Sequence, residues 1–367
     1  MAAVPIRVGI IGAGEVFQVC HGPCLFLMNH LFTIESICDI SQKNVSHCAT
    51  KWRIPHTTTQ PSETIQHPNV ELVFILTSDD SHAPLAISAI KAGKRVFIEK
   101  PMTLSLPSAQ SIIDAENEAG GGKVFVGYMR RYAPSYVNTF KRELATIPKI
   151  LYARCRDFSG PNAYFVNGSG TFQSKNFDFP PGAGKERDEA LEKLFREAFP
   201  GQEITQQKRD YCRFLGSLGS HDISLLRETL GRPERVTAVS ANQPFYSAIM
   251  DYRNTDGSSY SVTYESGIDS VPVFDAHLAV YGENKRLSIE YDSPYVKGLA
   301  IKVIVHELNE HGELQAREVV SSHEDAYTAE LREVYEWVRD GKSLKTGTGD
   351  AIEDIKIFDQ MYKAWNT

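Results

Sequence analysis

Several features that would place a protein in a special class are scarce or missing in this sequence. No apolar run reaches the length of a membrane-spanning helix, and the stretch at residues 6–12 is too short and wrongly flanked for a signal segment. No basic block occurs, and the formal net charge is −7, from 46 acidic and 39 basic side chains. We therefore expect a cytoplasmic protein that binds neither nucleic acid nor membranes.

Cysteine is also sparse, and its spacing is uninformative. The six cysteines lie at positions 20, 24, 38, 48, 155 and 212 without a C-x-x-C pair, which indicates reduced thiols and not a disulfide framework. Cys20, His21 and Cys24 could approach a metal ion from one helical face. Three ligands are too few for a complete metal site. We favour ordinary thiols beside a cofactor loop and predict no metal site.

What is present fits a two-domain enzyme. A chain of 367 residues with 42% hydrophobic and 23% charged residues can fill two cores. Residues 5–127 alternate between short strand-like and helix-like segments, as a doubly wound parallel sheet with crossover helices requires. We expect strands at 6–11, 32–38, 72–77, 95–98 and 123–126, and helices at 14–27, 41–51, 81–92 and 106–119.

The sequence pattern of the second half is typical of a mostly antiparallel sheet. Strand-like stretches separated by turns are expected at 150–158, 235–242, 258–265, 276–281, 286–291 and 301–307, with closing helices at 325–340 and 348–365. We predict an α/β protein with a first domain at 1–127 and an α+β substrate-binding and oligomerisation domain at 128–367. The closing helices, 325–365, are free to pack back on the first domain.

One long insertion interrupts the second half. Residues 160–213 are rich in Gly, Pro, Asn and Phe and then form a charged helix near 185–199. A segment this long inside a compact domain is usually functional or an interaction element. We expect a lid or a subunit contact.

The turn after the first strand has the composition of a dinucleotide-binding loop. Gly12 and Gly14 allow a tight turn and close approach of backbone to a pyrophosphate, and Glu15 and Val16 begin the following helix. Phe17 replaces the third glycine of the usual fingerprint, whose role is packing. We predict that Gly12, Gly14, Glu15 and Val16 bind the cofactor.

Asp39 follows the second strand, where an acidic residue binds the ribose hydroxyls in this architecture. A 2′-phosphate would be repelled there, so we predict NAD. Lys43 nearby keeps NADP open, and a helix-capping role of Asp39 is the structural alternative.

Further motifs resemble the glucose-fructose oxidoreductase, inositol dehydrogenase and MocA (Gfo/Idh/MocA) family. They are the segment 92–101, which ends in Glu-Lys-Pro, the loop 76–82, the segment 127–132, a Gly-x-His helix start and the closing helices. The resemblance implies a Rossmann domain, an NAD(P)-dependent oxidoreductase and a homodimer or homotetramer. It adds Thr77, His82, Glu99 and Lys100 to the predicted cofactor-binding residues.

Two residues are predicted to be catalytic. Lys100 stands at a strand's carboxyl end, where a lysine can stabilise an alkoxide or move a proton if burial lowers its pKa. His221 matches the family's histidine at a loop-to-helix junction, and an imidazole suits removal of a hydroxyl proton. The sequence departs from the family at Ser217 and Ser224, where aspartates are usual.

Three more residues are predicted to bind substrate. Asp222, next to His221, points about 100° away around a helix, so we assign it to substrate hydroxyls. Tyr128, Arg130 and Tyr132 would share one side of an extended segment, and Tyr128 and Arg130 suit a polyhydroxylated ring. A domain interface is the alternative for this segment.

These expectations combine into hydride transfer between nicotinamide and a carbinol carbon of a sugar, polyol or related cyclic alcohol bound between the two halves. One alternative is an enzyme with tightly held NAD that performs net epimerisation, elimination or glycoside cleavage. The other is a non-catalytic NAD-binding sensor, suggested by Ser217 and Ser224.

Overall fold

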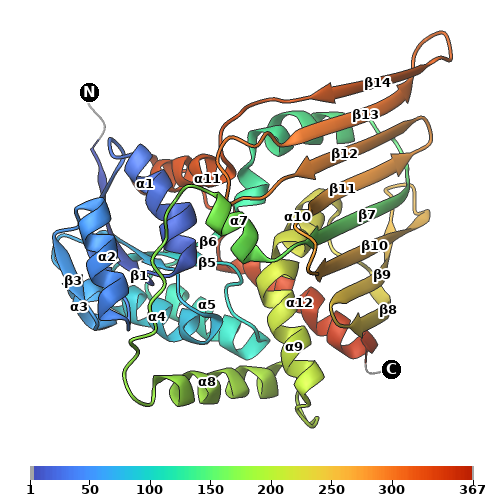
Figure 1. Ribbon diagram of the computed structural model, residues 1–367. Helices are drawn as coiled ribbons and strands as arrows, with labels where there is room; N and C mark the ends of the chain where they lie inside the picture. The colour runs from blue at the N-terminus through green and yellow to red at the C-terminus, as the bar shows by residue number, and fades with distance from the viewer. Residues whose placement is uncertain (1–3, 366–367) are drawn as a thin grey trace. The chain divides into compact units, whose positions relative to one another are not determined.

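The computed structural model describes residues 4–365, which form two compact units (Figure 1). The first unit contains the described residues up to Tyr128, with Thr171–Gly216 and Glu330–Ile355. The second contains Met129–Gly170, Ser217–Ala329 and the described residues from Lys356 onward. The predicted boundary near residue 127 recurs, but two segments predicted for the second domain lie in the first unit.

The first unit is built on a six-stranded parallel sheet with strand order β3-β2-β1-β4-β5-β6. The strands are β1 (Ile6–Ile11), β2 (Phe32–Cys38), β3 (His56–Thr58), β4 (Leu72–Ile75), β5 (Arg95–Glu99) and β6 (Val124–Gly127). Its inner strands β1, β4 and β5 are almost wholly buried, as expected when helices cover both faces. The predicted α/β class and doubly wound sheet are confirmed.

Helices connect these strands near the four predicted positions, and α3 is present in addition. They are η1 (Phe17–His21), α1 (Gly22–Leu27), α2 (Gln42–Trp52), α3 (Pro61–Gln66), α4 (Asp79–Lys91) and α5 (Leu106–Glu118). The helix expected at 14–27 is not regular, because η1 is a π-helical turn and α1 continues from it. Among the described residues, no helix is long and apolar enough to cross a membrane.

The insertion belongs to the first unit from Thr171 onward, because its helix α8 (Ala183–Ala198) has an apolar face that packs there. Helix α8 buries Leu191, Leu194, Phe195 and Ala198 and contacts α4 and α5. Helix α9 (Gln206–Phe214) packs on α8, where Arg209 pairs with Glu192 at 3.0 Å. A contiguous second domain from 128 onward therefore does not describe the chain.

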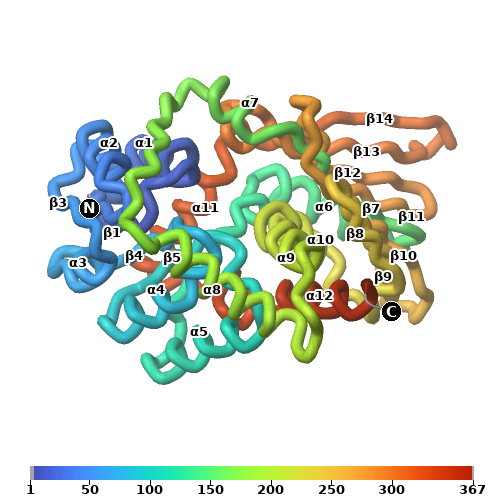
Figure 2. Tube along the Cα trace, turned by 60° about the horizontal axis from the view of Figure 1, so that its bottom comes forward, coloured from blue at the N-terminus to red at the C-terminus, as the bar shows by residue number. Residues whose placement is uncertain are grey.

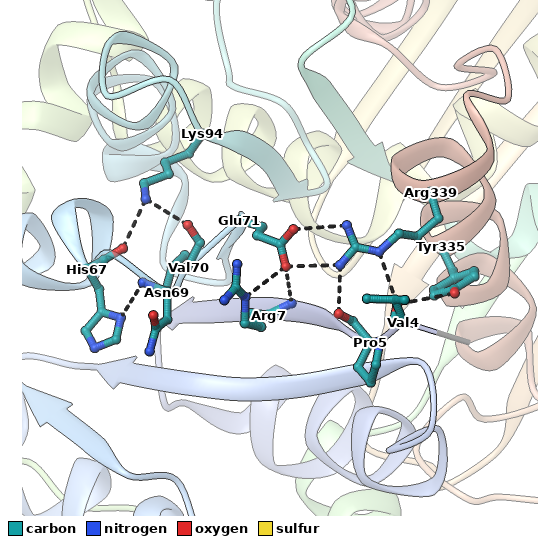
Figure 3. A network of polar contacts seen from close by, with 10 residues as sticks. All are labelled: Val4, Pro5, Arg7, His67, Asn69, Val70, Glu71, Lys94, Tyr335 and Arg339. Atoms are coloured by element: carbon teal, nitrogen blue, oxygen red, sulfur yellow. Dashed lines mark hydrogen bonds and ion pairs between the residues drawn. The ribbon is translucent and has the colours of Figure 1, made fainter. Parts of the chain in front are cut away.

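The closing segment is fastened to the opening strand of the first unit by one ion-pair network (Figure 3). Arg339, in η5 (Glu336–Asp340), donates from Nη1 and Nη2 to the two oxygens of Glu71, each at 3.0 Å, and to the Pro5 carbonyl at 2.7 Å. The backbone N–H of Arg7 also donates to Glu71 at 3.1 Å. The Arg339 hydrogen bond outweighs burial and lowers the pKa of Glu71 to about 2.

The second unit contains an eight-stranded sheet with order β14-β13-β12-β11-β7-β10-β9-β8 (Figure 2). All neighbours are antiparallel except β7 with β10. The strands are β7 (Ile150–Ser159), β8 (Arg235–Asn242), β9 (Phe245–Arg253), β10 (Ser259–Ile268), β11 (Phe274–Gly282), β12 (Lys285–Tyr291), β13 (Lys302–Leu308) and β14 (Leu314–Val319). The predicted antiparallel sheet is confirmed, with β9 and β14 in addition.

Two of the remaining elements differ from the geometry expected for the site. Met129–Tyr132 is a 3₁₀ helix (η2), so residues 128, 130 and 132 do not alternate as in a strand. His221 lies inside α10 (Ser220–Leu230), and the π-helical η4 (Leu215–Gly219) leads directly into it without a loop. The other helices are η3 (Ser135–Phe140), α6 (Lys141–Leu144), α7 (Asn162–Gly168), α11 (Ala326–Tyr335) and α12 (Thr348–Trp365).

Candidate functional site

The glycine turn after β1 has the geometry of a phosphate-binding loop. Gly12 has φ +109, and a Cβ there would lie 2.5 Å from the Leu76 carbonyl oxygen, so a side chain is excluded on both counts. A Cβ at Gly14 would meet nothing within 4 Å, and Gly14 lines a pocket. The turn therefore leaves room beside its backbone, which is what an NAD pyrophosphate requires.

Phe17, at the place of the third fingerprint glycine, is fully buried. Its ring packs edge-on against Trp52 of α2, with ring centroids 4.9 Å apart. The π-helical turn η1 begins at this residue. The substitution thus affects helix packing and leaves the Gly12–Gly14 turn open.

Asp39 supports the same turn. Its Oδ2 accepts the backbone N–H of Ala13 and its Oδ1 accepts that of Ser41, both at 2.8 Å. Burial raises the pKa of Asp39, and these two backbone donors act in the opposite direction. Asp39 therefore combines the predicted ribose position with a structural role at the start of α2.

A pocket of about 550 Å³ lies over these elements. Five of the predicted cofactor residues line it, namely Gly12, Gly14, Glu15, Asp39 and Thr77. Val16, His82, Glu99 and Lys100 are not among its lining residues. The volume is typical of small-molecule and cofactor sites, and the open cradle at Gly14 fits a dinucleotide.

His82 joins two of the predicted loops. Its Nδ1 lies 2.8 Å from the Pro101 carbonyl oxygen and its Nε2 lies 3.1 Å from that of Thr77. The ring is buried in α4, directly after the β4 loop. His82 therefore ties the Thr77 loop to the Glu99-Lys100-Pro101 turn from beneath, a positioning role within the first unit.

Glu99 has a similar supporting position under Lys100. It is buried at the end of β5, accepts the backbone N–H of Lys100 at 3.0 Å and lies 2.6 Å from Nε2 of His21. Burial would raise the pKa of Glu99, but the hydrogen bond and charge of His21, followed by the charge of Lys100, outweigh it and lower that pKa. The carboxylate thus fixes the backbone from which Lys100 projects.

The cysteines near this turn have no arrangement typical of a metal site. His21 is directed at Glu99, and Cys20 and Cys24 are buried. Among residues 4–365 no group of three or more His, Cys, Asp or Glu side chains is placed to hold a metal ion. All six cysteines are buried, and no disulfide joins them within this part of the chain.

Residues that sequence reasoning missed line the pocket from the insertion. Gln173–Phe177 and Phe179 contribute to its wall, and Gln18 and Asn44 of the preceding elements line it as well. Ser174 exchanges two hydrogen bonds with Gln18, at 2.8 Å and 2.7 Å. The only sequence signal was the unusual length of the insertion, which does not specify its partners.

In the second unit, the predicted substrate-binding residues Arg130 and Asp222 form a buried cluster with Asp157. Arg130 donates from Nη1 to Asp222 at 2.5 Å and from Nη2 to Asp157 at 2.7 Å. All three are at most 4% exposed. The guanidinium also lies over the Tyr291 ring, 5.2 Å from its centroid. Arg130 and Asp222 therefore contact each other inside this unit, and their predicted substrate contacts remain a prediction.

The carboxyls of Asp157 and Asp222 both pair with the one guanidinium of Arg130. Burial raises the pKa of Asp222 well above its usual range, and the nearby Asp157 raises it further. Burial likewise raises the pKa of Asp157, although Arg130 opposes this. One guanidinium facing two carboxyls favours a state in which they hold one proton.

His221 begins the helix that carries Asp222. The Ser224 hydroxyl, at one position of a usual aspartate, donates to the His221 carbonyl oxygen at 3.2 Å. The Ser220 hydroxyl donates to the carbonyl oxygen of Ser217, the other such position, at 3.3 Å. The hydroxyl of Ser224 and the backbone carbonyl of Ser217 thus take part in hydrogen bonding along these helical turns. Tyr128 is buried in the core of the first unit.

Comparison with protein families matches two parts of the chain to one family. A model of an oxidoreductase family, described as its NAD-binding Rossmann fold, matches residues 6–128. The model of the same family's C-terminal alpha/beta domain matches residues 200–367. Residues 129–199, which include the pocket-lining residues 173–177 and 179 of the insertion, lie outside both matches.

Curated relatives are similar over part of the chain. The scyllo-inositol 2-dehydrogenase (NAD(+)) of Bacillus subtilis is 34% identical over 113 residues, 30% of this chain and 33% of that protein. The myo-inositol 2-dehydrogenase of Thermotoga maritima is 28% identical over 168 residues, 45% of this chain and 49% of that protein. The chain thus spans at most about half the length of these relatives.

Solved structures share the fold over nearly the whole chain. A levoglucosan dehydrogenase in complex with NADH and levoglucosan superposes with a TM-score of 0.72 at 15% identity, covering 98% of this chain and 97% of that one. A myo-inositol 2-dehydrogenase from Lactobacillus plantarum gives 0.69 at 21% identity, covering 99% and 98%.

Proposed function

The chain belongs to the Gfo/Idh/MocA oxidoreductase family, and from this membership we propose that it is an NAD-dependent dehydrogenase of a sugar, polyol or related cyclic alcohol. The inositol dehydrogenases among its relatives and the levoglucosan dehydrogenase among similar structures support this substrate class. A homodimer or homotetramer is part of the proposal.

One observation carries the proposal. Gly12, Gly14, Asp39 and Thr77, each just beyond the end of a parallel strand, line one pocket at the sheet edge where ligands bind in this architecture. Lys100 follows β5 at the same edge of the same sheet. A dinucleotide held by the glycine turn would extend along this edge.

The residue roles follow from ordinary acid–base chemistry. The bound nicotinamide supplies the site that accepts or returns the hydride. His221 takes the hydroxyl proton from the substrate, since a neutral imidazole is a competent base near neutral pH. Lys100 stabilises the alkoxide oxygen with its ammonium group, and Glu99 and His82 hold the turn on which it stands.

The direct test begins with the purified protein as isolated. Mass spectrometry identifies any dinucleotide that copurifies, and sugars, inositols and anhydrosugars are then screened for formation of reduced nicotinamide. We expect NAD to be found or to bind, and at least one cyclic polyol to reduce it in proportion to product. Absence of dinucleotide binding would refute the proposal.

Lys100→Met and His221→Asn test the assigned roles. Each variant should lower kcat by about 10²- to 10⁴-fold, the usual contribution of one acid–base group, while the Kd for NAD changes by less than about twofold. Unchanged turnover in both variants would contradict the roles. A non-catalytic sensor would bind NAD equally in all three proteins and oxidise no substrate in any of them.

A second candidate, net non-redox chemistry with permanently held NAD, is favoured by one observation. The segment Gln173–Phe179 is hydrogen-bonded across the pocket that would hold the cofactor. Such an enzyme would convert substrate without accumulating reduced nicotinamide. Product analysis beside the absorbance measurement separates the two candidates.

A further inference from the structure

The insertion crosses the pocket as an extended strap, defined here as residues 171–179. Figure 1 shows it running past α1 and α2 to α8, and Figure 2 shows the same course from below. Besides the two bonds between Ser174 and Gln18, the backbone N–H of Asn176 donates to Oδ1 of Asn44 at 3.1 Å. The Lys51 ammonium donates to the Thr171 carbonyl oxygen. The strap is thus tied to η1 at one side of the pocket and to α2 at the other.

The end of the strap delivers a carboxylate to the start of α2. Asp178 accepts a hydrogen bond from the Ser41 hydroxyl and another from the backbone N–H of Lys43, the latter at 3.1 Å. Asp39 accepts the backbone N–H of the same Ser41. Two carboxylates, one from β2 and one from the insertion, therefore hold Ser41 between them.

The Ser41 hydroxyl and the Lys43 backbone N–H lie where the 2′-phosphate of NADP would need hydrogen-bond donors. In dinucleotide-binding sheets, the ribose that carries the 2′-hydroxyl or 2′-phosphate lies at the end of the second strand. The amide groups at the start of the next helix are the natural donors for an anion there. In this protein Asp178 already accepts from that helix start, and its charge would repel a phosphate.

The electrostatics agree with two interacting carboxylates. The Ser41 hydroxyl, ahead of the Lys43 backbone N–H, lowers the pKa of Asp178, so this group is ionised at neutral pH. After burial, the charge of Asp178 is the other influence that raises the pKa of Asp39. The pair is close enough for each charge to be felt by the other.

We propose that Asp178, held by the strap, acts with Asp39 to make the pocket selective for NAD against NADP. The proposal rests on the proposed function, because it concerns the dinucleotide that this function uses. It assigns a role to the strap, residues 171–179, which neither family match covers. The sequence pointed to Asp39 alone, whereas Asp178 lies 139 residues later in the chain.

The test measures the Kd values of NAD⁺ and NADP⁺ by isothermal titration calorimetry, with no substrate present. Asp178→Asn removes the charge and keeps one acceptor oxygen of the two that Ser41 and Lys43 use. We expect it to tighten NADP⁺ binding by about 5- to 10-fold, as loss of one exposed like charge predicts, and to leave NAD⁺ binding within about twofold. Asp39→Asn with Asp178→Asn should shift the ratio further.

Glu186→Gln is the matched control, because Glu186 lines the same pocket from α8 and loses the same charge. Its NADP⁺ affinity should change less than that of Asp178→Asn. The inference is overturned if Asp178→Asn leaves the ratio of the two Kd values unaltered, or if the unmodified protein binds both dinucleotides equally. Either result leaves the proposed function standing. Failure to bind either dinucleotide overturns both.

Discussion

The pocket of the first unit and the charged cluster of the second unit both contain two carboxylates, but the partners of those carboxylates differ. Asp39, which lines an open pocket, and Asp178, beside it on the strap, accept from backbone N–H groups and a hydroxyl. Asp157 and Asp222 share one guanidinium and are fully enclosed. Neutral donors leave the first pair able to act on a ligand, whereas the second pair is committed to Arg130.

The largest expected effect tests the enclosed cluster. Arg130→Met removes the guanidinium that pairs with two buried carboxyls, and we expect a loss of about 3–5 kcal/mol in the free energy of unfolding, as for other broken buried pairs. Denaturant unfolding of the full chain measures it.

A matched variant distinguishes lost charge pairing from lost packing. Adding Asp157→Asn and Asp222→Asn to Arg130→Met removes the buried charges and should recover part of the stability. If Arg130→Met costs less than about 1 kcal/mol, the cluster is not the enclosed ion pair described above.

The next effect tests the open pocket. Gly14→Val should weaken NAD binding by about 100-fold, because the side chain enters space that the pyrophosphate needs. The thermal midpoint should change little, since no atom lies within 4 Å of the new Cβ.

Gly12→Ala is the control for Gly14→Val and should differ from it in the effect on stability. Its Cβ would clash with the Leu76 backbone in a conformation with φ +109, so stability falls along with binding. Equal losses of stability in the two variants would show that Gly14 is structural.

The smallest effect concerns a side-chain ion pair inside the first unit. Glu71→Gln weakens the contact with Arg339 and should cost about 1–2 kcal/mol at pH 7. Because the folded-state pKa of Glu71 is about 2, below its ordinary 4.5, its contribution is present above pH 4.5 and is lost as the pH falls through about 2.

Unfolding of the two proteins at a series of pH values measures this dependence. The stability difference between wild type and Glu71→Gln should shrink steadily from pH 5 towards pH 2. A difference that stays constant over this interval would mean that Glu71 is not the titrating group.

Strand prediction succeeded where the local pattern was strong. β1, β2 and β8 have the predicted bounds, because each is a run of strand-forming residues with clear ends. β3 has only three residues, too few for a periodic signal. The 3₁₀ turn at Met129–Tyr132 depends on packing and not on the sequence pattern, so the predicted alternation was wrong.

The candidate site likewise contains residues that the local sequence predicts and contacts that it does not. The Gly12–Gly14 turn was identifiable because its chemistry is contained in consecutive residues. The partners of Arg130 and Asp222, and the contact of Asp178 with Ser41, join segments 92 and 137 residues apart, and no local pattern specifies them.

The sequence by itself determined the parallel sheet, the glycine turn and the lysine that follows β5, because each depends on neighbouring residues and their intrinsic preferences. Only the tertiary structure decided that the insertion returns to the first unit and covers the pocket. That outcome depends on the apolar face of α8 finding α4 and α5, an interaction between surfaces that are distant in the chain.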